Sequence, residues 1–210
     1  MCIRDSLRGV KAKLVEHDEL WVQGDSVMQG YWQNEEATNK TIVEAADGRW
    51  LKTGDCASID HQGYIRIVGR IKDILVLANG EKVPPTDIEI AIARDPLFDQ
   101  VMVVGESKPF LAALVVLNDD QLSALCQQKG WSEDDLRTAK FQTFLTKQIA
   151  RQMTNFPGYA KIRNVHICQQ AWTIDDGLLT STMKIKRPKI SEHYKSEIEA
   201  MYVGHGVKKI

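Results

Sequence analysis

The stretch Tyr64-Ile65-Arg66-Ile67-Val68-Gly69-Arg70-Ile71-Lys72-Asp73 is the point at which the pattern of the sequence changes. Its first five residues alternate in polarity with a period of two, which is typical of a half-buried antiparallel strand. Residues 10–15 and 19–22 show the same alternation. We therefore predict a β-rich segment over residues 10–77, with a turn at 60–63. One short helix is predicted within this segment, over residues 35–46.

The sequence after Pro84 indicates mixed helices and strands. Thr86 and Glu89 have the spacing of a capping box, which predicts a helix that begins near Pro85. Apolar, β-branched runs predict two strands, over residues 101–105 and 111–118. Further helices are predicted over residues 120–129, 132–156 and 188–204. The predicted fold class is therefore α+β, with the junction between the two halves at residues 69–73.

The composition excludes several classes of protein. Lys and Arg number 27 against 28 Asp and Glu, so the basic surplus of a dedicated nucleic-acid binder is missing. The longest apolar run, residues 110–117, is far shorter than the roughly 20 residues of a membrane span, and no signal peptide is visible. The four cysteines are scattered, which predicts neither a zinc site nor disulfides. We expect a cytoplasmic protein with no metal site in this chain.

Two segments near the junction contain candidate binding residues. Asp55 follows Thr53-Gly54, and a carboxylate after a glycine turn can accept two hydrogen bonds from a vicinal diol such as a ribose. It can equally satisfy its own turn. Arg70 follows a strand and can present its planar guanidinium to a phosphate or ribose, or it can be a solvated surface charge. Neither residue decides the function alone.

Two further segments lie in the second half. Asn79-Gly80 is a strong hairpin signal, and a glycine at the tip also permits the close approach of a ligand. Four of the six residues over 184–189 are basic. Such a run can bind nucleic acid or direct nuclear import, or it can be a solvated turn before a helix. Lys184 can instead supply a cation to a phosphoryl-transfer site.

The order of these segments is more informative than any one of them. Residues 19–32 are followed by Thr53-Gly54-Asp55, then by the junction at 69–73, and then by Leu-Thr-Ser-Thr-Met-Lys-Ile-Lys-Arg at 179–187. This succession resembles the C-terminal part of the AMP-forming adenylating enzymes. It is most similar to the long-chain acyl-CoA synthetases, or long-chain fatty acid–CoA ligases.

The resemblance covers residues 7–203, and the stretch 79–85 is similar to the fatty-acid branch in particular. It implies that residues 7–71 form the C-terminal, β-rich (distorted barrel) part of a large AMP-binding domain. Residues 72–210 are then a small, mixed α+β C-terminal lid domain. Residues 1–6 match nothing in the family and are expected to be a non-native tail.

The resemblance also implies roles for five residues in a two-step reaction. In the family, a carboxylate and ATP give an acyl-adenylate and pyrophosphate, and coenzyme A then takes the acyl group. Asp55 matches the aspartate that holds the ribose of ATP and AMP, and Arg70 matches a neighbouring nucleotide contact. Lys72 matches the hinge about which the lid rotates, and Gly80 lies in a segment that lines the CoA channel. Lys184 matches the catalytic lysine of adenylation.

Three positions depart from the family pattern, and larger parts of it are missing. Arg49 lengthens an Asp-Gly-Trp run, Cys56 replaces a branched aliphatic residue, and Met183 stands where glycine is common. The family's phosphate loop and fatty-acid tunnel are not recognisable in these 210 residues, and the Mg²⁺ ligands are expected in that upstream part. We therefore expect a C-terminal fragment that is inactive alone.

The implied partners are small molecules: a long-chain fatty acid, ATP and coenzyme A. No nucleic acid and no membrane span are expected, whereas peripheral association with a membrane surface is left open. Two alternatives also stay open. The chain can belong to another acid–thiol ligase of the same superfamily, or it can be a stand-alone, noncatalytic binding module with the lid fold.

Overall fold

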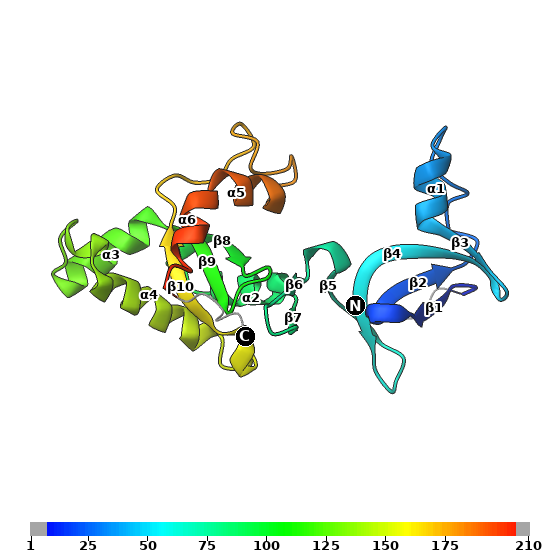
Figure 1. Cartoon of the computed structure of the whole chain (residues 1–210), viewed down its shortest axis with the longest axis horizontal. Coiled ribbons are helices and arrows are strands. Elements are labelled where there is room, and N and C mark those ends of the chain that lie inside the picture. The colour runs from blue at the N-terminus through cyan, green and yellow to red at the C-terminus, as the bar shows by residue number, and fades with distance from the viewer. Residues whose placement is uncertain (1–7, 205–210) are drawn as a thin grey trace. The chain divides into compact units, whose positions relative to one another are not determined.

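The computed structural model describes residues 8–204, which divide into two compact units (Figure 1). The first unit ends at Ile74 and the second begins at Leu75. The tail predicted over residues 1–6 lies outside the described residues. No helix in residues 8–204 combines the length and the apolar character that crossing a bilayer requires.

The first unit is built on an open, antiparallel five-stranded sheet. Its strands are β1 (Lys11–Leu14), β2 (Glu19–Gln23), β3 (Ile42–Ala45), β4 (Gly48–Ile59) and β5 (Ile65–Arg70). They follow the order β1-β2-β4-β3, and β5 also pairs with β4. The long strand β4 thus contacts three others and organises the unit. This sheet agrees with the β-rich segment predicted for the first half of an α+β fold. The described strands of the sheet do not close into a barrel.

Local signals explain the turns of this unit and one error in the prediction. The turn at 60–63 is confirmed: the Asp60 carboxylate accepts hydrogen bonds from the backbone amides of Gln62 and Tyr64, and Gly63 has a φ of 84°. The predicted helix over 35–46 was too long. Helix α1 (Glu35–Thr41) ends where the β-branched Ile42-Val43 begins to pair with β4 as β3.

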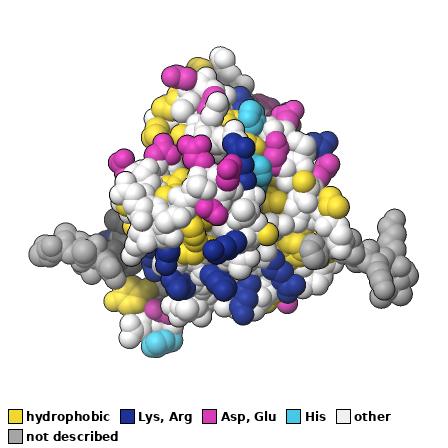
Figure 2. Space-filling model, turned by 90° about the vertical axis from the view of Figure 1, so that its left-hand side faces the viewer, with side chains coloured by type: hydrophobic (Ala, Val, Ile, Leu, Met, Phe, Trp, Pro, Cys, Tyr) yellow, Lys and Arg dark blue, Asp and Glu magenta, His cyan; other side chains and the backbone are white. Residues whose placement is uncertain are grey.

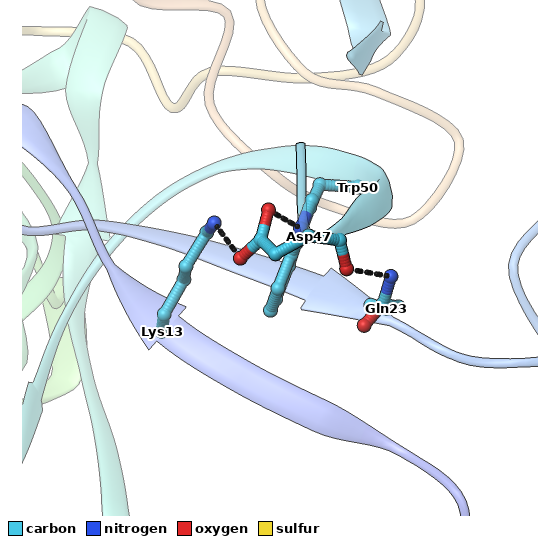
Figure 3. Close-up of polar contacts among 4 residues, drawn as sticks. All are labelled: Lys13, Gln23, Asp47 and Trp50. Carbon is cyan, nitrogen blue, oxygen red and sulfur yellow. Dashed lines mark hydrogen bonds and ion pairs between the residues drawn. The ribbon is translucent and has the colours of Figure 1, made fainter. Parts of the chain in front are cut away.

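A small polar cluster fixes the hairpin between β3 and β4 (Figure 3). Asp47 accepts hydrogen bonds from Lys13 Nζ at 2.8 Å and from Trp50 Nε1 at 2.9 Å. Gln23 Nε2 donates to the Asp47 carbonyl. The hydrogen bond from Lys13, and then that from Trp50, lower the pKa of Asp47 below its usual value. These contacts tie three strands together at the start of β4.

The second unit has a three-stranded sheet, a short hairpin and five α-helices among its described residues. Its strands are β6 (Leu75–Val76), β7 (Lys82–Val83), β8 (Phe98–Val104), β9 (Leu111–Leu117) and β10 (Ile162–Ile167). Its helices are α2 (Pro85–Ile92), α3 (Asp119–Lys129), α4 (Ala139–Gln152), α5 (Arg187–His193) and α6 (Lys195–Ala200). The sheet order is β10-β9-β8, with β9 parallel to β10 and antiparallel to β8.

Strand β9 is the centre of this unit because all seven of its residues are buried. One face, which includes Leu111 and Val115, packs against a core cluster with α2 and α4. The other face, which includes Leu114, packs against a cluster with Trp172 and Ile190. A strand that is covered on both faces reads as a continuous apolar run, which is why the sequence predicted β9 almost to the residue.

Helix boundaries in this unit were predicted less well. Helix α3 is confirmed, and Gly130 ends it with a φ of 65°. The helix predicted over 132–156 is instead a turn, a 3-10 segment (Asp135–Arg137) and α4. The Asp135 carboxylate accepts from the amide and hydroxyl of Ser132, and the Thr138 side chain caps α4. These local hydrogen bonds compete with a continuous helix.

Two other helix predictions were wrong in detail. The final helix begins at Arg187 and breaks at Tyr194, so it forms α5 and α6 rather than one helix. The capping box of Thr86 and Glu89 is not formed, because α2 has no side-chain cap at its start. Glu89 instead accepts a hydrogen bond from the amide of Val103 in β8.

Candidate functional site

Asp55 and Arg70 lie directly opposite each other on β4 and β5. Arg70 Nε is 3.1 Å from Asp55 Oδ1, and the side chain of Asp55 is 26% exposed whereas that of Arg70 is 69% exposed. Cross-strand pairs of opposite charge stabilise such a sheet modestly. The pair therefore orients the exposed guanidinium without burying it.

Asp55 sits within a strand rather than after a turn, which corrects the sequence-based interpretation. Gly54 has a φ of 71° inside β4, a conformation that favours glycine. Its amide donates to Glu19 Oε1, and the hydroxyl of Thr53 donates to the Leu20 carbonyl at 2.7 Å. These bonds to β2 fix the irregular backbone that precedes Asp55.

A cavity of about 730 Å³ opens beside this pair, within the first unit. Its lining includes four cationic side chains, Lys40, Lys52, Arg70 and Lys72, and one carboxylate, Glu19. A surplus of positive charge in a hollow attracts anions. Asp55 is not itself a lining residue, but it contacts Arg70, which is. Sequence reasoning missed Lys40 and Lys52 because only the fold brings α1 and β4 to one hollow.

Lys72 and Gly80 lie on opposite sides of the division between the units. Lys72 is exposed in the 3-10 turn Ile71–Asp73, just before the division after Ile74. Gly80 is exposed near the tip of the β6–β7 hairpin, where it has a φ of 85° and its amide donates to the Leu77 carbonyl. Gly80 therefore confirms the predicted hairpin turn.

Lys184 lies on a small exposed hairpin of the second unit. The Thr180 amide donates to the Lys184 carbonyl at 2.8 Å, and the Lys184 amide donates to Thr180 Oγ1 at 3.0 Å. Leu179 and Ile185 form the β-bridge that closes the hairpin. Met183 occupies the tip with a φ of 61°. That left-handed conformation is uncommon for a residue with a side chain and is the one that glycine adopts most readily.

The cations of the basic run over 184–189 lie in two different environments, one exposed and one largely buried. Lys184 is exposed, and its ammonium forms no ion pair with any described side chain. Arg187 is 16% exposed at its side chain and pairs with Glu89, which is 12% exposed. Sequence reasoning grouped these cations because charge alone carries no information on burial.

The structure thus collects Asp55, Arg70 and Lys72 in the first unit, and Gly80 and Lys184 in the second. In residues 8–204, no three His, Cys, Asp or Glu side chains gather as ligands for a metal ion.

Burial raises the pKa of the Cys168 thiol to about 11, so this cysteine stays protonated at neutral pH and is a poor nucleophile.

Comparison with known proteins adds the family. Residues 72–205 match the model of the AMP-binding enzyme C-terminal domain. The long-chain-fatty-acid–CoA ligase FadD15 of Mycobacterium tuberculosis is 35% identical over 199 residues, which cover 92% of this chain and 32% of the ligase. Long-chain-fatty-acid–CoA ligase 6 of Mus musculus is 32% identical, over 88% of this chain and 27% of its own length. The chain thus spans about a third of the length of these curated relatives.

Solved structures share the fold. The adenylation domain of a carboxylate reductase from Mycobacterium chelonae superposes with a TM-score of 0.77, at 26% identity, over 92% of this chain and 30% of that domain. The corresponding domain from Segniliparus rugosus, solved with AMP and a carboxylic acid, gives a TM-score of 0.75 at 26% identity, over 90% of this chain and 28% of its own.

Proposed function

Because the chain belongs to the family of AMP-binding enzyme C-terminal domains, we propose that it works as the C-terminal part of a long-chain fatty acid–CoA ligase. Such a ligase joins a fatty acid carboxylate to the α-phosphate of ATP and releases pyrophosphate. The thiol of coenzyme A then attacks the acyl carbon and releases AMP. The curated long-chain ligases at 32–35% identity support this substrate class.

The Asp55–Arg70 pair beside a cation-lined cavity is the observation that carries the proposal. The Asp55 carboxylate is able to accept hydrogen bonds from the two ribose hydroxyls of the nucleotide. Arg70, held by Asp55, donates to the nucleotide beside it. Residues 72–74 then form the hinge, where a few backbone dihedrals absorb the rotation of the second unit.

Lys184 and Gly80 belong to the part that moves in this proposal. The Lys184 ammonium approaches the fatty acid carboxylate and the α-phosphate during adenylation, and neutralises the charge that grows on their oxygens. Gly80 lets the thiol arm of coenzyme A pass close to the β6–β7 hairpin, since it has no side chain. ATP is commonly bound with Mg²⁺, and the proposal places the protein ligands of that ion upstream of these residues.

The purified 210-residue chain is expected to show no fatty-acid-dependent ATP–pyrophosphate exchange. The chain spans about a third of the relatives' length, and the proposal places the rest of the nucleotide and fatty-acid sites outside these residues. Exchange of radiolabelled pyrophosphate into ATP, with palmitate and Mg²⁺, measures this. Exchange above the background of a boiled sample would contradict the expectation.

The positive control is the protein encoded by the longest open reading frame that includes these residues. It should catalyse the exchange, and then form acyl-CoA when coenzyme A is added. A preference for long-chain fatty acids over aryl or medium-chain acids separates the proposal from another acid–thiol ligase. Absence of acyl-AMP formation with every acid would overturn it.

We also propose that the second unit associates peripherally with anionic membrane surfaces. Residues 136–174 contain six Lys and Arg and no Asp or Glu, although the whole chain has a net charge of -1. Lys140, Lys147 and Arg151 are exposed at intervals of seven and four along α4, so they share one side of that helix. Figure 2 looks onto the side of Figure 1 where α3 and α4 lie, and Lys and Arg gather in the lower part of this face.

Vesicle binding tests the membrane proposal on the chain as it is. We expect the chain to sediment with vesicles of phosphatidylcholine and phosphatidylserine, but not with phosphatidylcholine alone, and to dissociate at high salt. Lys147→Glu with Arg151→Glu should weaken binding by roughly tenfold or more, since each cation near such a surface contributes about 1 kcal/mol. Lys189→Glu with Lys195→Glu is the matched control and should bind normally. Equal loss in both double variants would contradict a specific role for α4.

A further inference from the structure

The outer edge of β8 is covered by side chains rather than by another strand. β8 is the last strand in the order β10-β9-β8, so one edge lacks a strand neighbour among the described residues. At Val103 the amide donates to Glu89 Oε1 at 2.7 Å, and the carbonyl accepts from Arg187 Nη1 at 3.3 Å. Glu89 and Arg187 therefore make the two bonds that a neighbouring strand would make.

The same two side chains bind each other. Arg187 Nη2 donates to Glu89 Oε2, and the side chains are only 16% and 12% exposed. The Glu89 carboxylate, the Arg187 guanidinium and the backbone of Val103 thus close a ring of hydrogen bonds, which we call the Glu89–Arg187 clasp. In such a partly buried site, removal of one partner leaves the other charge without compensation.

The clasp joins segments that are distant in the sequence. Glu89 lies on α2, whereas Arg187 is the first residue of α5, 98 residues later. Arg187 follows Lys184 by three residues. The clasp is therefore an anchor for the second arm of the Lys184 hairpin on the central sheet.

The other anchors of this arm are mainly apolar. The Lys186 amide donates to the Leu178 carbonyl, Ile185 bridges to Leu179, and Ile190 is buried further along α5. Leu178 and Leu179 belong to the core cluster on β9, and Ile185 packs against it, so apolar contacts hold the base of the hairpin. Arg187 adds the polar contact to the edge of β8, which fixes the direction of the second arm beyond that base.

From this geometry we infer that the Glu89–Arg187 clasp is a positioning pair, which sets where the hairpin presents the Lys184 ammonium. The inference rests on the proposed role of Lys184 in adenylation. Neither Glu89 nor Arg187 needs to touch substrate, and both act through the backbone between residues 184 and 187. Arg187→Lys keeps the charge but lacks the guanidinium fork, so it cannot hold Glu89 and Val103 at once.

Kinetics of the two half-reactions test the clasp in the protein from the longest open reading frame. Arg187→Lys and Glu89→Gln should lower the kcat of acyl-AMP formation by roughly 10–100-fold, with little change in KM, because a displacement of about 1 Å can cost that much. Conversion of supplied acyl-AMP and coenzyme A to acyl-CoA should change little, because the proposed function gives Lys184 no part in that step. A parallel fall in both half-reactions would show that the clasp is only structural.

Tyr202→Phe is the matched control for these variants. The Tyr202 hydroxyl donates to the carbonyl of Val104, the next residue of β8, at 3.2 Å. Its loss removes one side-chain bond to the backbone of β8 but leaves the Glu89–Arg187 clasp intact, so both half-reactions should be unchanged. Lys184→Ala separates the two hypotheses. If it leaves adenylation unaffected, the proposed function fails; if it alone abolishes adenylation while Arg187→Lys does not change it, the positioning inference fails.

Limited proteolysis provides a second readout on the 210-residue chain itself. In Arg187→Lys, trypsin cleavage after Lys184 should become about tenfold faster through local opening of the hairpin, while cleavage after Lys147 on α4 keeps its rate. The substitution adds no new site, because trypsin does not cleave before Pro188. Unchanged cleavage after Lys184 in a folded variant would overturn the inference.

Discussion

Lys184→Ala is expected to slow acyl-adenylate formation by about 10²–10³-fold in the protein from the longest open reading frame, the effect of removing one preplaced charge from a developing oxyanion. Lys184 is exposed and makes no ion pair with the described side chains, so its removal should not disturb the fold. Release of pyrophosphate in a single turnover measures this step. Conversion of supplied acyl-AMP to acyl-CoA should be nearly unchanged.

Lys189→Ala is the control, since Lys189 is an exposed lysine of the same basic run. It should leave both half-reactions as they are. Equal rates for Lys184→Ala and the unaltered protein would remove the catalytic role, and would favour the alternative in which the chain is a noncatalytic binding module. Met183→Gly gives no such information, because it relaxes the hairpin tip without touching the ammonium.

Leu145→Ala should lower the free energy of unfolding of the second unit by about 2–5 kcal/mol. Leu145 lies on α4, is fully buried, and belongs to the core cluster with Leu111 and Val115 of β9. Truncation removes apolar contacts and leaves a cavity that the close-packed sheet cannot fill. Global hydrogen exchange of the β9 amides reports the second unit alone and measures the change.

Lys147→Ala on the same helix is the matched substitution. Its side chain is exposed, so the change should stay within about 0.5 kcal/mol. If Leu145→Ala also stayed within that range, α4 could not be packed on the sheet as described. Both variants keep the helix propensity of α4 nearly constant, because Leu, Lys and Ala are all good helix formers.

The strands were predictable from their polarity patterns, although burial explains only some of these patterns. β9 is continuously apolar because both of its faces are covered. β5 alternates, but its apolar side chains Ile65 and Ile67 are exposed, so the half-burial predicted for this strand is not seen in the first unit. Helix boundaries were harder because local side-chain bonds decide them. Ser132 and Asp135 look like a helix start but form a closed turn, so α4 begins only after Thr138.

The candidate site also has residues that a local motif indicates and residues that only the fold brings together. Asp55 and Arg70 were found from their motifs, and the strand register brings them together as neighbours. The cationic lining from Lys40 and the clasp partner Glu89 were not found. Nothing in the sequence around Glu89 distinguishes a capping residue from one that reaches a distant strand edge, because the partner, Arg187, is 98 residues away.

The parallel pairing of β9 with β10 has a consequence for synthesis of the chain. Antiparallel β8 and β9 are joined by a short connection, but residues 118–161 separate β9 from β10. Parallel neighbours always require such a crossover. On the ribosome, β9 therefore emerges long before β10, with two apolar faces and an open edge. Nascent chains of this protein should depend on chaperones during that interval. Strand pairs that are far apart in the sequence, such as β9 and β10, also form slowly after release from the ribosome.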